Sequence, residues 1–124
     1  MQAKVLLVDD DRAICESLGR ALRTEGYDVT TAPGGFEALD LFRQAPFDLV
    51  LLDINMPVLN GWATLREMKE INPFVRVIVI TARPNQQELA AQAGVEILEK
   101  PLVLPSLVDL MRKLLTEAVG SRRV

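Results

Sequence analysis

Residues 4–11, Lys-Val-Leu-Leu-Val-Asp-Asp-Asp, join a short apolar run to three consecutive acidic residues. A continuous apolar run of this length is typical of a strand that is covered on both faces, as the strands of a parallel sheet are. The run ends abruptly at Asp9, so the acidic residues follow the carboxyl end of the strand. The stretch therefore predicts a buried strand that delivers carboxylates to one edge of a sheet.

Strand and helix patterns alternate along the rest of the chain. Each predicted strand is a short apolar or β-branched run, and each predicted helix has apolar positions three or four residues apart. Parallel strands need crossover connections, so this alternation predicts an α/β fold with a doubly wound five-stranded parallel sheet and helices on both faces. The predicted strands are residues 4–8, 27–31, 48–52, 75–80 and 95–98, and the predicted helices are 12–25, one around 36–42, one around 62–68, 86–93 and 105–119.

The size and charge of the chain indicate which class of protein it belongs to. A length of 124 residues suits one domain, which we place at 1–119, with 120–124 as a loose tail or the start of a linker. Fourteen Lys and Arg against seventeen Asp and Glu give a net charge of −3, so no basic excess favours direct binding to nucleic acid. The longest apolar runs are far below the ~20 residues of a membrane helix, so we expect a cytoplasmic protein that does not bind membranes.

Cysteine and histidine usage narrows the chemistry. The single cysteine, Cys15, cannot form an internal disulfide, which agrees with a reducing compartment. The chain has no histidine, which excludes histidine-based metal sites and Ser-His or Cys-His nucleophile pairs. Any chemistry must therefore use carboxylates, Lys, Thr, Ser or the backbone.

Polar side chains follow four of the five predicted strands. Asp9 and Asp10 follow the first strand, Asp53 the third, Thr81 the fourth and Lys100 the fifth. Each residue alone is explained by a helix cap, a turn or a solvated side chain. Because the carboxyl ends of parallel strands share one edge, where ligands bind in open α/β sheets, we expect all five to meet there.

Three clustered carboxylates indicate a cation. Like charges a few ångströms apart repel unless a cation neutralises them, and an all-oxygen ligand set favours Mg²⁺, for which Mn²⁺ can substitute. A carboxylate beside such an ion can attack a phosphoryl group and form an aspartyl phosphate. Asp53 stands alone at the end of the central strand and is the predicted nucleophile, with Lys100 and Thr81 placed to contact phosphoryl oxygens.

Four motifs in this order resemble the receiver domain of bacterial two-component response regulators. They cover nearly the whole chain: Leu7–Asp11, Leu52–Pro57, Ile80–Ala82 and Glu99–Pro101. The resemblance implies a flavodoxin-like fold with strand order 2-1-3-4-5. It also implies that a sensor histidine kinase or a phosphotransfer protein donates the phosphoryl group of a phosphohistidine to Asp53.

The resemblance assigns further roles to individual residues. Asp10, Asp53 and the backbone carbonyl of Asn55 would bind Mg²⁺ directly, and Asp9 would act largely through water. Thr81, Ala82 and Lys100 would contact the phosphoryl group, and the Lys100-Pro101 bond would be cis, as in relatives. Gly61, in the loop after the phosphorylation site, is expected to serve a turn.

The expected output is a change in the face formed by residues 86–93, 95–98 and 105–119, a two-state switch driven by local charge. Family members carry an aromatic switch residue three positions before the lysine, but this chain has Ile97, and the segment from Thr81 to Lys100 is shorter than in common relatives. The expected partners are a downstream protein or a removed output domain. A phosphorylation-dependent homodimer is left open.

Three alternatives compete with this interpretation. A phosphorylation-independent receiver-like scaffold would account for Ile97 at the position where family members carry an aromatic switch residue. A Mg²⁺-dependent phosphatase of the haloacid dehalogenase type would need a second acid two residues after Asp53, where this chain has Asn55. Flavin binding would need a phosphate loop in place of the acids that follow the first strand. We therefore expect a protein that promotes its own phosphorylation and dephosphorylation but is not a turnover enzyme.

Overall fold

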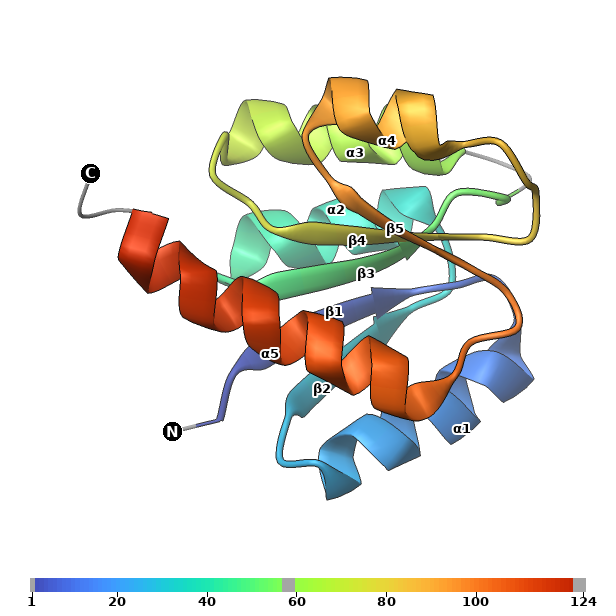
Figure 1. Cartoon of the computed structure of the whole chain (residues 1–124), viewed down its shortest axis with the longest axis vertical. Helices are drawn as coiled ribbons and strands as arrows, with labels where there is room; N and C mark the ends of the chain where they lie inside the picture. The colour runs from blue at the N-terminus through green and yellow to red at the C-terminus, as the bar shows by residue number, and fades with distance from the viewer. Residues whose placement is uncertain (1, 57–59, 122–124) are drawn as a thin grey trace.

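The computed structural model describes residues 2–56 and 60–121 of the chain. Five parallel strands form one sheet in the order β2-β1-β3-β4-β5 (Figure 1). The strands are β1 (Lys4–Val8), β2 (Asp28–Ala32), β3 (Leu49–Asp53), β4 (Val77–Thr81) and β5 (Glu96–Glu99), and the helices are α1 (Arg12–Thr24), α2 (Gly35–Gln44), α3 (Gly61–Ile71), α4 (Gln87–Ala93) and α5 (Leu104–Ser121). The predicted fold class and strand order are confirmed.

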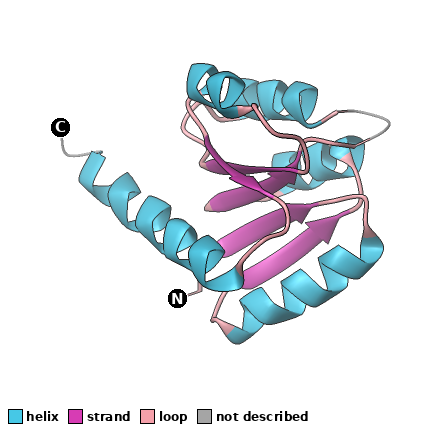
Figure 2. Cartoon of the chain, turned by 45° about the vertical axis from the view of Figure 1, so that its right-hand side comes forward, coloured by secondary structure: helices cyan, strands magenta, loops and turns pink. Residues whose placement is uncertain are grey.

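Helices cover both faces of the sheet (Figure 2). Successive side chains of a strand point to opposite faces, so Leu6 packs with residues of α2 and α3 while its neighbour Leu7 packs with residues of α1 and α5. Every residue of β3 and β4 is buried. The two resulting core layers hold the strands in register, and their carboxyl ends form one edge.

Local signals set several helix ends as the sequence predicts. The Asp11 side chain caps α1 by accepting from the backbone N–H groups of Ala13 and Ile14 at 3.0 and 3.2 Å. Gly94 ends α4 in the left-handed region at φ 70°, where glycine carries no Cβ penalty. With only seven residues, α4 is as short as the reduced Thr81–Lys100 spacing indicates.

The end of the chain differs from the prediction. Gly120 and Ser121 continue α5, so the loose tail predicted for residues 120–124 does not begin at residue 120. A single glycine costs a helix only about 1 kcal/mol relative to alanine, and no proline follows Val119 to stop the helix. Residues 122–124 lie outside the described residues, as do Pro57 and Leu59 of the loop that follows Asp53, and the linker stays a prediction.

Gly61 also has a different role from the expected turn. It is the first residue of α3, and a Cβ there would lie 2.2 Å from the Cα of Ile54. The backbone N–H of Gly61 donates to the carbonyl of Ile54 at 3.3 Å. Glycine is therefore required because α3 begins in close contact with the backbone that follows β3.

Of the helices in residues 2–56 and 60–121, none combines the length and the apolar character that crossing a membrane requires.

Candidate functional site

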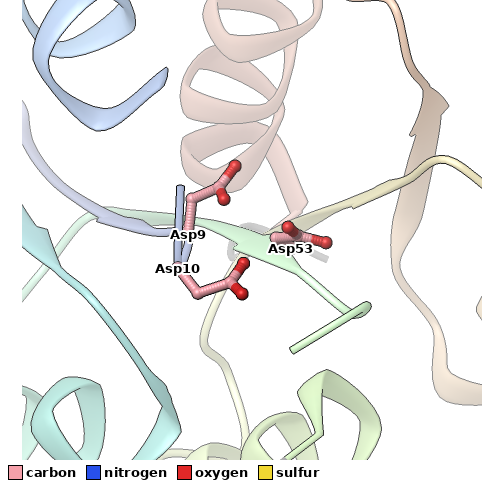
Figure 3. A group of neighbouring side chains, drawn as sticks. All are labelled: Asp9, Asp10 and Asp53. Carbon is pink, nitrogen blue, oxygen red and sulfur yellow. The ribbon is translucent and has the colours of Figure 1, made fainter. Parts of the chain in front are cut away.

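Three carboxylates meet at the carboxyl edge of the sheet, as predicted. Asp9 and Asp10 follow β1 and Asp53 ends β3, and one carboxylate oxygen of each lies within 4.8 Å of those of the other two (Figure 3). Asp9 and Asp53 are each 2% exposed, whereas Asp10 is exposed to solvent. The cluster thus has two buried members and one open side.

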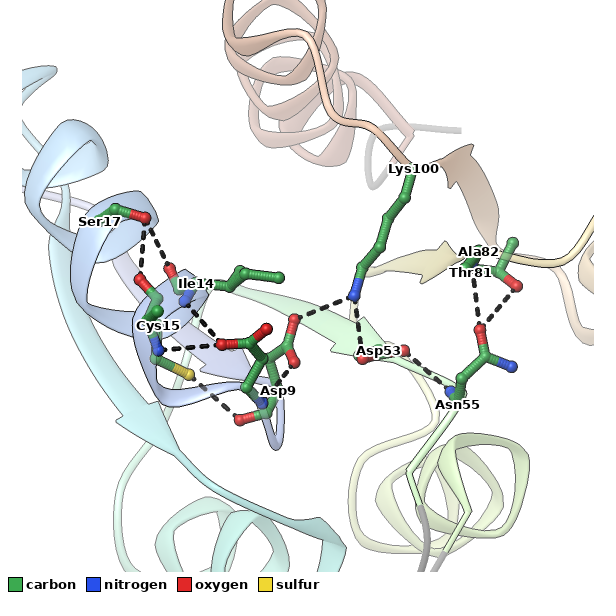
Figure 4. A network of polar contacts seen from close by, with 11 residues as sticks. Asp9, Ile14, Cys15, Ser17, Asp53, Asn55, Thr81, Ala82 and Lys100 are labelled. Atoms are coloured by element: carbon green, nitrogen blue, oxygen red, sulfur yellow. Dashed lines mark hydrogen bonds and ion pairs between the residues drawn. The ribbon is translucent and has the colours of Figure 1, made fainter.

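Lys100 brings a positive charge into this cluster. Its Nζ lies 3.2 Å from Oδ2 of Asp53 and 3.4 Å from Oδ2 of Asp9 (Figure 4). The backbone N–H of Lys100 donates to the carbonyl of Thr81 at 2.7 Å, and the following Lys100-Pro101 bond is cis, as the resemblance implied. The ammonium therefore bridges the ends of β1 and β3 from the loop that follows β5.

The electrostatics of the cluster favour a bound cation. Burial raises the pKa of Asp9 above its usual 3.8, and the nearby Asp53 carboxylate adds to this effect, while the Asp11 N–H and the Lys100 ammonium oppose it. Burial alone would lower the pKa of Lys100, but the Asp53 and Asp9 carboxylates outweigh burial and raise it. One ammonium against three carboxylates leaves an excess of negative charge.

The donor set fits Mg²⁺. All three side chains offer carboxylate oxygens, the hard ligands that Mg²⁺ prefers, and the exposed Asp10 leaves room for the several waters that this ion keeps. Asn55 lies in the adjacent turn, where its N–H donates to Oδ1 of Asp53 at 2.9 Å. A metal-ligand role for the Asn55 carbonyl stays a prediction.

The family model for the response regulator receiver domain matches residues 5–112 of this chain. The chain belongs to the response regulator receiver domain family. This match includes all the acidic residues of the cluster as well as Lys100.

Individual relatives agree with this assignment. The receiver domain described here is 42% identical over 118 residues to the response regulator MprA of Mycobacterium sp. strain KMS and 40% identical to that of Mycobacterium tuberculosis strain CDC 1551 / Oshkosh. In both cases the alignment covers 93% of this chain and 51% of the relative. The chain thus spans about half the length of these curated relatives.

Solved structures show the same fold. A CheY-like receiver domain protein from Methanospirillum hungatei JF-1 superposes with a TM-score of 0.92 at 27% identity, covering 98% of this chain and 99% of that one. The response regulator TrrA from Thermotoga maritima, solved in complex with Mg²⁺-BeF, superposes with a TM-score of 0.84 at 33% identity, covering 91% of this chain and 99% of that one.

The receiver domain places its other predicted contact residues beside Asn55. The hydroxyl of Thr81, which is fully buried, donates to Oδ1 of Asn55 at 3.0 Å, and the N–H of Ala82 donates to the same oxygen at 3.0 Å (Figure 4). The hydroxyl also accepts from the N–H of Arg83 at 3.0 Å, and the Arg83 carbonyl, at 3.4 Å, is a second and longer acceptor for its proton. Sequence reasoning missed this role of the Asn55 side chain, and its place two residues after Asp53 was the only signal for it.

Ile97 lies away from this polar edge. It is half-buried in β5 and packs against the core layer that contains α2 and α3, whereas its neighbour Leu98 packs against the layer that contains α1 and α5. The residue is therefore an aliphatic packing residue in this structure, and its part in a switch stays a prediction.

Proposed function

We propose that this receiver domain is switched by Mg²⁺-dependent transfer of a phosphoryl group to Asp53. The observation that carries the proposal is the Asp53 carboxylate, which is 2% exposed, lies 3.2 Å from the Lys100 ammonium and clusters with Asp9 and Asp10. A carboxylate oxygen of Asp53 attacks the phosphorus of a phosphohistidine on a sensor histidine kinase or a phosphotransfer protein. A P–O bond forms, the P–N bond breaks, and the departing imidazole takes up a proton.

The cation would be held by Asp9, Asp10, Asp53 and the backbone carbonyl of Asn55. When bound, Mg²⁺ or Mn²⁺ offsets negative charge on the transferring oxygens. Lys100, at 3.2 Å from Asp53, is placed to donate to one phosphoryl oxygen, and Thr81 and Ala82 would donate to another. That TrrA, at 33% identity, was solved in complex with Mg²⁺-BeF supports the choice of Mg²⁺.

The output of the switch would be a change in the face formed by α4, β5 and α5. We infer that this face binds a downstream protein or an output domain. The curated response regulators that the chain matches are longer than this chain, which spans about half of their length. A phosphorylation-dependent homodimer would use the same face. In this proposal the protein acts in the cytoplasm, does not bind nucleic acid through this domain, and is not a turnover enzyme.

Intact mass spectrometry after incubation with acetyl phosphate tests the proposal. We expect a gain of about 80 Da, one phosphoryl group, that requires Mg²⁺ and is absent in Asp53→Asn. Asp48→Asn is the matched control, because Asp48 precedes the opposite end of the same strand and is exposed. It should gain the mass as the wild type does.

Failure of the wild type to gain this mass would contradict the proposal, provided that a panel of histidine kinases and beryllofluoride also give no adduct. The phosphorylation-independent scaffold, which the aliphatic Ile97 favours, would then replace it. Multiple turnover on small phosphate esters would instead favour a phosphatase of the haloacid dehalogenase type.

A further inference from the structure

One side-chain oxygen accepts both hydrogen bonds that the proposed switch requires for the phosphoryl group. Oδ1 of Asn55 lies 3.0 Å from the Thr81 hydroxyl and 3.0 Å from the Ala82 nitrogen. Because a backbone N–H can only donate, the atom of the carboxamide that faces Ala82 is its oxygen. Asn55 therefore holds these two donors in the unphosphorylated protein.

Each donor has a single hydrogen. The Thr81 hydroxyl has one proton to donate, and so does the Ala82 N–H. The Arg83 carbonyl, at 3.4 Å, is a second and longer acceptor for the Thr81 proton, so a phosphoryl oxygen on Asp53 competes mainly with the Asn55 carboxamide for the same two protons. The carboxamide oxygen is the weaker acceptor of the two, because hydrogen bonds to an ionised group are roughly twice as strong as those between neutral groups.

The surroundings give the carboxamide room to leave. Asn55 is half-buried and borders an open hollow of about 730 Å³ on the α3–α4 side of the site, together with Trp62, Arg83 and Gln86. Its backbone position does not depend on the carboxamide, because the Asn55 N–H donates to Oδ1 of Asp53 at 2.9 Å. The side chain can thus rotate into the hollow while the turn that carries it stays in place.

We propose that the Asn55 carboxamide is a competing acceptor that holds Thr81 and Ala82 in the resting arrangement and must be displaced when Asp53 is phosphorylated. The inference rests on the proposed phosphorylation of Asp53. Asn55 acts through Thr81 and Ala82 and is a positioning residue. Its side chain sets how far the resting state is favoured over the switched state.

Beryllofluoride affinity at saturating Mg²⁺, followed by Trp62 fluorescence, tests this role. Asn55→Ala and the near-isosteric Asn55→Leu remove the acceptor but keep the backbone carbonyl. Losing one to two competing hydrogen bonds of about 1 kcal/mol each should tighten beryllofluoride binding about five- to thirtyfold. Gln86→Ala is the matched control, because Gln86 also lines this hollow and its side chain makes no cap hydrogen bond to α4. The beryllofluoride affinity of this variant should stay within about twofold of that of the wild type.

Amide exchange of Ala82 in Mg²⁺-free protein tests the same contact directly. Both Asn55 variants should speed exchange at Ala82 and leave the strand amides protected. If the wild type binds beryllofluoride and both variants bind it equally or more weakly, the competing role of Asn55 is refuted while the proposed function stands. If the wild type does not bind beryllofluoride, the proposed function itself fails.

Discussion

The close contact between Gly61 and Ile54 gives a quantitative prediction for Gly61→Ala. The added Cβ would lie 2.2 Å from Cα, 2.7 Å from Cγ2 and 2.8 Å from Cβ of Ile54, whereas unbonded carbons pack at about 3.5–4.0 Å. The nearest of these atoms belongs to the backbone, so α3 or the segment after β3 must move by roughly 1 Å. Overpacking of this kind costs about 1–3 kcal/mol or more, and the better helix propensity of alanine recovers at most about 1 kcal/mol.

We therefore expect Gly61→Ala to lower the free energy of unfolding by about 2 kcal/mol. Urea denaturation followed by circular dichroism would show this as a midpoint lowered by about 1 M, given typical slopes for small domains. Gly34→Ala is the matched control, since Gly34 is the N-cap of α2 with an extended backbone at φ −169°, and a Cβ there meets only the side-chain end of Glu37, at 3.0 Å.

The control should lose about 1 kcal/mol or less, because alanine is a poorer N-cap than glycine but the exposed Glu37 side chain can move aside. The reasoning would be refuted if Gly61→Ala unfolded within about 0.5 kcal/mol of the wild type. An equal loss in Gly34→Ala would refute it as well, because the effect would then belong to any glycine at a helix start.

Three further predictions concern the polar edge. Asp9→Asn should raise the melting temperature by a few degrees in Mg²⁺-free buffer at neutral pH, because burial raises the pKa of Asp9 and the folded state therefore favours its neutral form. The gain should shrink as the pH falls toward 3.8. Thermal unfolding that shows the variant to be less stable than the wild type at every pH would contradict this prediction. Lys100→Gln should slow phosphorylation by acetyl phosphate, measured by mass spectrometry, about 100-fold. It should not weaken Mg²⁺ binding, measured by Trp62 fluorescence. An unchanged phosphorylation rate would show that Lys100 takes no part in the reaction. Thr81→Ala should weaken beryllofluoride binding about tenfold and leave Mg²⁺ binding unchanged. Equal beryllofluoride affinity would show that the hydroxyl gains nothing by exchanging Asn55 for the phosphoryl mimic and would contradict its proposed role.

Much of this molecule follows from its apolar runs. The strands β1, β3 and β4 are nearly uniform in apolar residues because both faces of a parallel sheet are covered, so their positions are readable from the sequence. Since parallel strands end at one edge, Asp9, Asp53 and Lys100 are expected at that edge, and the strand order that the family resemblance implied places the ends of β1 and β3 side by side. For the same reason the predicted site needed no knowledge of side-chain conformations.

Other features depend on packing that no periodic pattern reveals. The hydrogen bonds that the Asn55 side chain accepts depend on its rotamer and on how closely the segments after β3 and β4 approach each other. The need for glycine at position 61 depends on where α3 begins relative to Ile54. The extension of α5 to Ser121 was missed because Gly120 resembles a helix stop, although a single glycine does not by itself end a helix.

Locating the phosphoryl group tests the central claim most directly. After incubation with Mg²⁺ and acetyl phosphate, borohydride reduces an aspartyl phosphate to homoserine, and tandem mass spectrometry of the proteolysed chain then identifies the converted position. The account predicts homoserine at position 53 alone, formed only with Mg²⁺ present. Conversion at another aspartate, Asp10 included, or conversion independent of Mg²⁺ would contradict it.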